Sequence, residues 1–155
     1  NSDETGIIVA GRGIDNHFYI LEDKSGVFSP DRWIKFACQL YYKWSADRIV
    51  CEVNNGGDLI EKLLRVQDVN VPYSSVRATR GKMLRAEPIS ALYEQGKVHH
   101  VGYFKELEEQ MCSYTPDTVK SPDRLDALVW GITSLMNSGK AIFRISWGLY
   151  NGIIW

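Results

Sequence analysis

Short apolar runs alternate with amphipathic stretches along most of this chain of 155 residues. Five runs rich in β-branched and aromatic residues favour strands: 5–13, 18–22, 48–54, 71–76 and 98–101. Five stretches with apolar residues at helical spacing favour helices: 29–44, 58–65, 82–94, 104–114 and 121–136. Two strands followed by alternating helices and strands predict an α/β fold, with a mixed central β-sheet flanked by helices on both faces.

Turn and capping residues mark the ends of these elements. Asp15-Asn16 predicts a hairpin turn between the first two strands. Segments 29–31 and 121–123 both read Ser-Pro-Asp, in which serine caps a helix, proline fits its first turn and the acid favours the helix dipole. Asp58 is predicted to cap a helix that begins at Leu59 and turns Leu59 inward.

The chain divides into one predicted domain at 1–137 and a C-terminal tail at 138–155. The domain is long enough to bury a sizeable core. In the tail, residues 141–147 are strand-like and the last three residues, 153–155, are apolar. We expect the tail to pair on a sheet edge or to pack against another chain.

Composition adds three expectations. With 45% hydrophobic residues, 24% charged residues and a net charge of −1, the chain has no overall attraction to nucleic acid or membrane, so any polyanion site must be a local patch. Cys38, Cys51 and Cys112 lie far apart in apolar surroundings, which predicts buried free thiols. No apolar run is long enough to span a bilayer and no signal peptide is present, so we expect a soluble intracellular protein.

Glu52 follows Ile49, Val50 and Cys51 in an apolar run that is typical of a buried strand. A carboxylate in such a strand is costly unless it is paired or binds a metal. The turn residues at 54–57 end the strand, so Glu52 is predicted near its carboxyl end, where open α/β sheets place their sites. We therefore treat Glu52 as the first candidate site residue.

Asp123 and Asp126 form a second acidic element. Spaced three residues apart, they share one face in the first turns of the last predicted helix. If this helix packs near Glu52, the carboxylates converge and require a cation. Their hard oxygen ligands select Mg²⁺ or Mn²⁺, and two such ions can hydrolyse a phosphodiester. Asp3, just before the first strand, is a further candidate metal ligand.

Each of these acids also has a structural interpretation, and the sequence leaves both open. Asp123 can simply favour the start of its helix. Asp126 can be an ordinary solvated residue. Glu52 can pair with a buried arginine instead of a metal.

A basic segment follows the fourth predicted strand and contains Arg77, Arg80, Lys82 and Arg85. Cations at a helix start oppose the helix dipole, which favours a role in facing phosphate. Such a segment would bind a DNA backbone without reading its sequence. The adjacent pair at 99–100 is two histidines on an extended segment, which point to opposite faces, so structural roles are favoured over a metal site.

Six segments together resemble the C-terminal nuclease domain of the large terminase subunit of tailed bacteriophages and prophages: 3–7, 52–58, 82–88, 92–102, 107–111 and 121–129. The resemblance implies a ribonuclease-H-like fold and a metal-dependent endonuclease that cuts concatemeric double-stranded DNA during packaging. It also implies the portal protein and the small terminase subunit as partners, in the cytoplasm of a bacterial host.

Carried over residue by residue, the resemblance matches Glu52 to the second acid of the family's site and Asp123 to the acid at the start of the last helix, with Asp126 close by. Asp3 matches an acid often found near the metals, and the segment of Lys82 and Arg85 matches one that faces DNA. The family's first catalytic aspartate ends a central strand upstream of Asp3, and that strand is not in this sequence. The strand-like run of the tail is a candidate for its place in the sheet.

Two alternatives to a packaging endonuclease remain open. One is another nuclease on the same fold, such as a Holliday-junction resolvase or a transposase core. The other is a truncated, catalytically impaired nuclease fold that only docks on DNA or on the portal, which the departure at the first strand favours.

Overall fold

The computed structural model describes residues 4–53, 57–79, 81–115, 117–118, 122–138 and 152–154. The strands are β1 (Ile8–Arg12), β2 (Phe18–Asp23), β3 (Arg48–Glu52), β4 (Tyr73–Val76), β5 (Val98–His100) and β6 (Gly152–Ile154). The helices are α1 (Pro30–Lys43), α2 (Gly57–Gln67), α3 (Lys82–Glu94), α4 (Lys105–Ser113) and α5 (Asp123–Asn137). These elements confirm the predicted order of an opening hairpin followed by alternating helices and strands.

The six described strands form one mixed sheet in the order β4-β3-β6-β1-β2-β5. β1 and β2 are an antiparallel hairpin, whereas β3 pairs with β4 and β2 pairs with β5 in parallel. Asn16 takes a left-handed conformation with φ of 61° in the hairpin turn, as asparagine tolerates. The mixed sheet and its helices confirm the predicted fold class.

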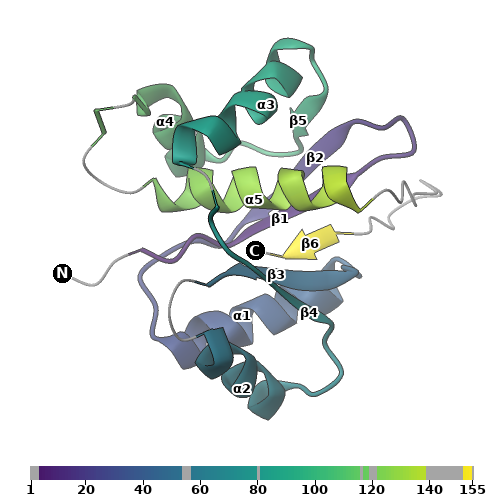
Figure 1. Ribbon diagram of the computed structural model, residues 1–155. Helices are drawn as coiled ribbons and strands as arrows, with labels where there is room; N and C mark the ends of the chain where they lie inside the picture. The colour runs from purple at the N-terminus through teal and green to yellow at the C-terminus, as the bar shows by residue number, and fades with distance from the viewer. Residues whose placement is uncertain are drawn as a thin grey trace.

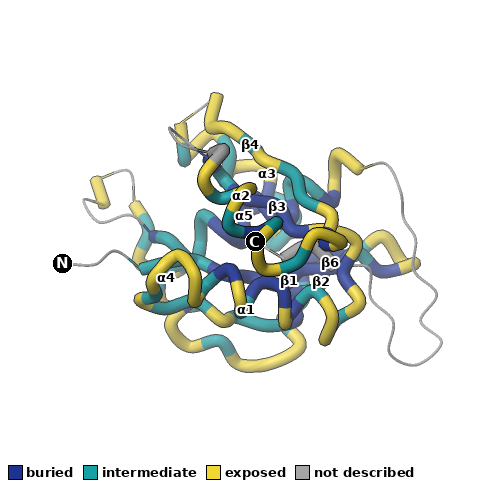
Figure 2. Tube along the Cα trace, turned by 90° about the horizontal axis from the view of Figure 1, so that it is seen from below, coloured by how far each residue is buried: buried dark blue, intermediate teal, exposed yellow. Residues whose placement is uncertain are grey.

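Helices cover both faces of the sheet, with α1 and α2 on one side and α3, α4 and α5 on the other (Figure 1). The alternation of side chains along β1 produces these two layers, because successive residues of a strand point to opposite faces. Ile7 and Val9 pack into the core beneath α1, while Ile8 and Ala10 pack into the core beneath α5. Buried residues follow the central strands, and exposed residues follow the outer loops (Figure 2).

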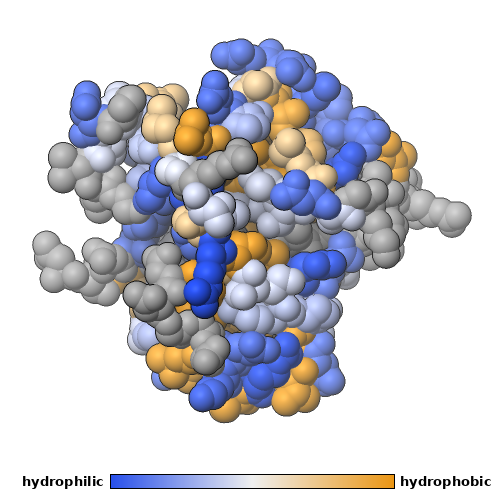
Figure 3. All heavy atoms as spheres, viewed as in Figure 1, coloured by the Kyte–Doolittle hydropathy of each residue, from blue (hydrophilic) through white to orange (hydrophobic). Residues whose placement is uncertain are grey.

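The start of α2 corrects two predictions. The helix begins at Gly57, so Asp58 is its second residue and not its cap. Leu59 was expected to face inward, but it is 61% exposed. Leu64 is buried in this helix. Leu59 and Val66 are exposed, and apolar side chains gather on the surface over α2 (Figure 3). The helical spacing was right, but Ile60, Leu63 and Leu64 form the side of α2 that packs on the core, and Leu59 lies outside it.

The end of the tail lies inside the sheet. β6 pairs antiparallel with β1 and parallel with β3, between them (Figure 1). The expectation that the tail pairs on a sheet edge is therefore wrong for residues 152–154. The strand-like run at 141–147 lies outside the described residues.

The cysteines differ in their surroundings. Cys38 and Cys51 are buried free thiols as predicted, but Cys112 is exposed on α4, which corrects that expectation. Burial raises the pKa of Cys51 to about 12, so this thiol is protonated at neutral pH and packs as a small apolar side chain.

Candidate active site

Three chain segments meet at the edge of the sheet that is formed by the ends of its strands: the start of β1 and the ends of β3 and β4. Because β6 runs antiparallel to β1 and parallel to β3, the start of β1 lies beside the end of β3. β3 and β4 are parallel and in register, with Glu52 opposite Val76, so the chain leaves both strands at this edge. This edge is the carboxyl end of the parallel strands, where α/β folds place their sites.

A cavity of about 360 Å³ opens at this edge. Its lining residues come from six separate segments: Glu4, Thr5, Gly6, Trp33, Cys51, Glu52, Ile60, Lys82, Asp123 and Asp126. The structure therefore brings Glu52, at the end of β3, and Asp123 and Asp126, in the first turn of α5, around one cavity. The N-terminus of α5 favours anions at this position through its dipole.

Two cations from the start of α3 pair with these acids. Lys82 forms an ion pair with Asp126, whose side chain is 17% exposed. Arg85 Nη1 lies 3.6 Å from Glu52 Oε1. The pairing of Glu52 with a buried arginine, one of the alternatives above, is thus present in the structure. Asp126 is not an ordinary solvated residue.

Arg85 is held in an unusual way for a cation. Its side chain is only 10% exposed, and its guanidinium carbon lies 4.5 Å from the centre of the Trp130 ring, in a cation–π arrangement. Its Nε and Nη1 atoms are buried without a hydrogen-bond acceptor. Arg85 therefore interacts with the acidic side of the cavity, and any contact with DNA requires its side chain to move.

Of the other predicted DNA-binding residues, the structure describes Arg77 and Lys82. Arg77 is exposed in the loop after β4, and Arg80 lies outside the described residues. Lys82 lines the cavity directly, with a side chain that is 39% exposed. Among the described residues of the basic segment, Lys82 is the one that lines the acidic cavity.

The donor atoms of the cavity suit a hard divalent cation. Glu52, Asp123 and Asp126 are among its lining residues, and Mg²⁺ and Mn²⁺ prefer carboxylate oxygens as ligands. In the part of the chain that the structure describes, no three acids, histidines or cysteines lie close enough together to form a metal site as they stand. Asp3, the remaining predicted ligand, lies outside the described residues.

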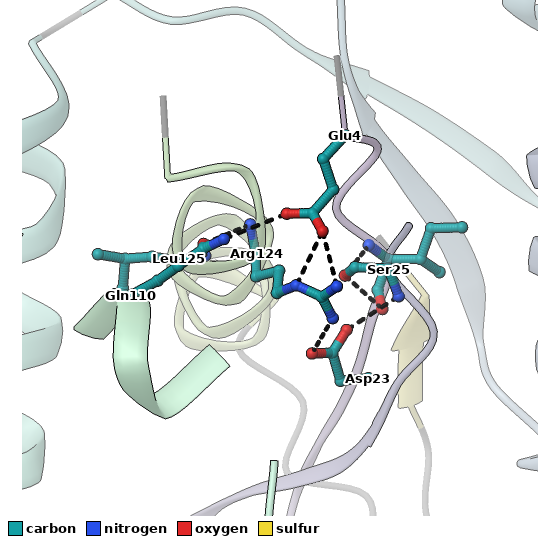
Figure 4. Close-up of polar contacts among 7 residues, drawn as sticks. Glu4, Asp23, Ser25, Gln110, Arg124 and Leu125 are labelled. Carbon is teal, nitrogen blue, oxygen red and sulfur yellow. Dashed lines mark hydrogen bonds and ion pairs between the residues drawn. The ribbon is translucent and has the colours of Figure 1, made fainter. Parts of the chain in front are cut away.

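A buried ion-pair cluster fixes the start of α5 beside the cavity (Figure 4). Arg124 donates from Nε and Nη2 to Glu4 Oε1, at 3.1 and 2.6 Å, and from Nη1 to Asp23 Oδ2, at 2.8 Å. Its side chain is 13% exposed and that of Asp23 only 5%. Burial alone lowers the pKa of Arg124, but its bonds to Asp23 and Glu4 outweigh this and raise the pKa, so the guanidinium remains charged.

Gln110 on α4 completes this cluster. Its side-chain oxygen accepts hydrogen bonds from the backbone N–H groups of Arg124 and Leu125, at 3.0 and 3.2 Å. Pro122, the residue before the helix, makes no side-chain cap. Gln110, on a different helix, therefore supplies the acceptor for two backbone N–H groups of the first turn of α5. Its side-chain nitrogen donates to Glu4 Oε2 at 3.1 Å (Figure 4). These contacts hold the backbone next to Asp123 in place.

Gly6 allows α5 to approach the segment before β1. A Cβ atom at Gly6 would lie 2.1 Å from the backbone oxygen of Asp123 and 3.0 Å from the Cβ of Ala127. We expect Gly6→Ala to displace the start of α5, to lower the free energy of unfolding by about 1–3 kcal/mol and to weaken binding of Mn²⁺. Urea unfolding and calorimetric titration with Mn²⁺ measure the two effects.

Gly102→Ala is the control for this prediction. A Cβ atom at Gly102 would meet its nearest neighbour, the Phe104 ring, at an ordinary distance of 3.5 Å. We expect wild-type stability and Mn²⁺ affinity for this variant. Wild-type behaviour of Gly6→Ala in both measurements would show that the close contact with α5 does not matter.

The histidines of β5 have structural partners on opposite faces. His99 stacks on His17, with ring nitrogens 2.7 Å apart. His100 lies 2.7 Å from the Tyr93 hydroxyl and 3.0 Å from Glu108. Neither histidine lines the acidic cavity.

A larger cavity, about 760 Å³, lies between α3, α4 and α5. Apolar side chains such as Met83, Ile89 and Leu128 form most of its lining, and the acids of the first cavity are not among its residues. Volume alone would select this groove, but the predicted site acids line the smaller cavity.

Sequence analysis did not single out several residues that shape the site. Glu4 follows Asp3 directly, and Arg124 follows Asp123, so both lie within segments that were noticed for their neighbours. Trp33 has the helical spacing of a core residue, and it packs on the core while also lining the cavity. No sequence pattern distinguishes such a residue from an ordinary packing residue.

The mixed sheet with helices on both faces fits a ribonuclease-H-like fold, and the acidic cavity lies at the carboxyl end of β3. The sequence matches the family described as a terminase RNaseH-like domain over residues 1–135. The chain belongs to this family, which confirms the resemblance found in the sequence.

No curated protein matches the chain in sequence. Within the described residues, none of the helices has the length and apolar character that crossing a membrane demands.

Proposed function

We propose that this chain is the endonuclease domain of the large subunit of a viral DNA-packaging terminase, and that it cuts concatemeric double-stranded DNA with Mg²⁺ or Mn²⁺. The observation that carries this proposal is the convergence of Glu52, Asp123 and Asp126 around one cavity, in a member of the terminase RNaseH-like family. Phosphodiester hydrolysis by divalent ions uses such a group of carboxylates.

In this proposal, Glu52 and Asp123 hold the metal, with Asp126 and Asp3 as further ligands or supporting acids. Two divalent ions, when bound, supply an activated water and stabilise the leaving oxygen of the phosphodiester. Lys82, on the rim of the same cavity, attracts and orients a phosphate oxygen. Trp33 and Ile60 give the cavity an apolar wall, which limits the water that enters it.

The remaining partners follow from the family and are part of the same proposal. In this proposal Arg77, Arg80, Lys82 and Arg85 contact the DNA backbone, Arg85 only after its side chain leaves Glu52. The portal protein and the small terminase subunit are its further partners, in the cytoplasm of the bacterial host.

Cleavage of a supercoiled plasmid tests the function. We expect nicked and linear products with Mn²⁺ or Mg²⁺ and none in EDTA. Binding of a duplex should also weaken steeply with salt, because lysine and arginine release counterions from the phosphates they contact. Equal cleavage with and without divalent ions would contradict the metal-dependent mechanism.

A second candidate is a nuclease fold that binds DNA or the portal without cutting. The ion pairs of Lys82 with Asp126 and Arg85 with Glu52 favour this candidate, because two of the three acids already pair with the protein's own cations. Mn²⁺ titration separates the two, since a docking domain shows no Mn²⁺ binding that depends on Glu52.

A further inference from the structure

The acids of the cavity have counter-ions within the protein itself. Lys82 is the first residue of α3, and Arg85 follows three residues later on the same face of the helix. Lys82 pairs with Asp126 on α5, and Arg85 pairs with Glu52 on β3. Two positive charges from one helix therefore lie against carboxylates from two other elements.

These ion pairs offset the repulsion between the acids. Carboxylates that share a cavity repel one another unless cations are present or one of them is protonated. Lys82 and Arg85 supply that positive charge. A divalent ion that enters the cavity adds positive charge beside Lys82 and Arg85, and like charges repel each other.

The two cations differ in how easily they can leave. Arg85 is 10% exposed and lies against Trp130, so packing restrains it. Lys82 is 39% exposed and has a flexible stem with a compact ammonium group, so it can rotate towards solvent from the same backbone position. Lysine is also a good ligand for a phosphate oxygen.

We propose that Lys82 is a displaceable internal counter-ion, which holds Asp126 until a divalent cation binds and then turns to a phosphate oxygen of the substrate. This inference rests on the proposed function and adds a coupling to it: metal binding frees the cation that captures the DNA backbone. Lys82 thus has two positions, one at the acid and one at the substrate.

The coupling makes opposite predictions for metal and DNA. In Lys82→Met, Mn²⁺ no longer competes with an ammonium group, so calorimetric titration of the whole chain should show Mn²⁺ binding tightened roughly tenfold. Binding of a short DNA duplex, followed by fluorescence anisotropy, should strengthen on addition of Ca²⁺ in the wild type. That strengthening should be largely lost in Lys82→Met.

Two controls isolate the counter-ion effect. Lys43→Met removes a lysine that pairs with Glu22 at 2.7 Å outside the cavity lining, and we expect unchanged Mn²⁺ affinity. Lys82→Arg keeps the positive charge and should bind Mn²⁺ nearly as the wild type does. Circular dichroism checks folding, and if Lys82→Met does not fold, Lys82→Gln must show the same tightening.

The outcomes separate this inference from the proposed function. If the wild type binds Mn²⁺ through Glu52 but the loss of the Lys82 charge leaves the affinity unchanged or weaker, the counter-ion role is wrong and the metal site stands. If the wild type shows no Mn²⁺ binding that depends on Glu52, the proposed function fails and the inference fails with it.

Discussion

Glu52→Gln is expected to abolish Mn²⁺ binding and to lower DNA cleavage by more than about a hundredfold, because even residues that only support a metal ligand change affinity or activity by up to about that factor. The substitution keeps the shape of the side chain and removes its charge. Calorimetric titration with Mn²⁺ and plasmid cleavage measure the two effects. The variant also leaves Arg85 without its acidic partner, so its fold must be checked by circular dichroism.

Glu22→Gln is a close match as a control for this prediction. The Glu22 side chain is 23% exposed, against 22% for Glu52, and it also lies near the end of a strand and pairs with a cation. It accepts hydrogen bonds from Lys43 and from the Trp44 indole, both at 2.7 Å, and it does not line the cavity. We expect normal Mn²⁺ binding and cleavage for this variant. If both glutamine variants behave alike, the effect comes from a lost ion pair and not from a lost metal ligand.

Arg124→Met is expected to destabilise the fold more than any other single change considered above. It leaves the Asp23 carboxylate, 5% exposed, and Glu4 without their cation, and removal of one partner from a buried ion pair costs about 3–5 kcal/mol. For a chain of this size the melting temperature should fall by roughly 10 °C. Because Asp123 is adjacent to Arg124 in the chain, Mn²⁺ binding should weaken as well.

Lys43→Met provides the comparison for Arg124→Met. Lys43 is 59% exposed in its pair with Glu22, and exposed ion pairs contribute no more than about 1 kcal/mol. Thermal unfolding of the two variants under the same conditions measures the difference. A melting temperature for Arg124→Met close to that of Lys43→Met would show that the cluster in Figure 4 does not fix the start of α5.

The architecture was predictable because its signals are local. Apolar periodicity gave α1, α3 and α5 within a few residues of their ends, and Asp15-Asn16 gave the hairpin turn. The exposure of Leu59 on α2 was not predictable, since the Leu and Ile residues of this helix spread over a broad arc and only packing decides which of them are buried. The position of β6 depends on strand pairings between distant residues, which local pattern does not encode.

The site was predictable as a set of acids but not as a set of contacts. A carboxylate at the end of a buried strand and two acids at a helix start identified Glu52, Asp123 and Asp126, which the structure places around one cavity. Pairing of Glu52 with a buried arginine was left open as an alternative, but Lys82 and Arg85 were assigned to DNA from their position at a helix start, so neither was named as the partner of an acid. The cluster of Arg124, Glu4 and Asp23 joins residues about a hundred positions apart, and a single sequence carries no signal for such pairs.

The central claim is that Glu52 and Asp123 hold a divalent ion between them. A crystal of the whole chain soaked in Mn²⁺ tests it most directly, because anomalous scattering locates manganese without reference to activity. We expect a manganese peak in the cavity, within about 2.0–2.6 Å of oxygens from both carboxylates, with the Lys82 ammonium moved away from Asp126. A fully soaked crystal with no manganese at these two acids, and the Lys82–Asp126 and Arg85–Glu52 pairs intact, would contradict the account.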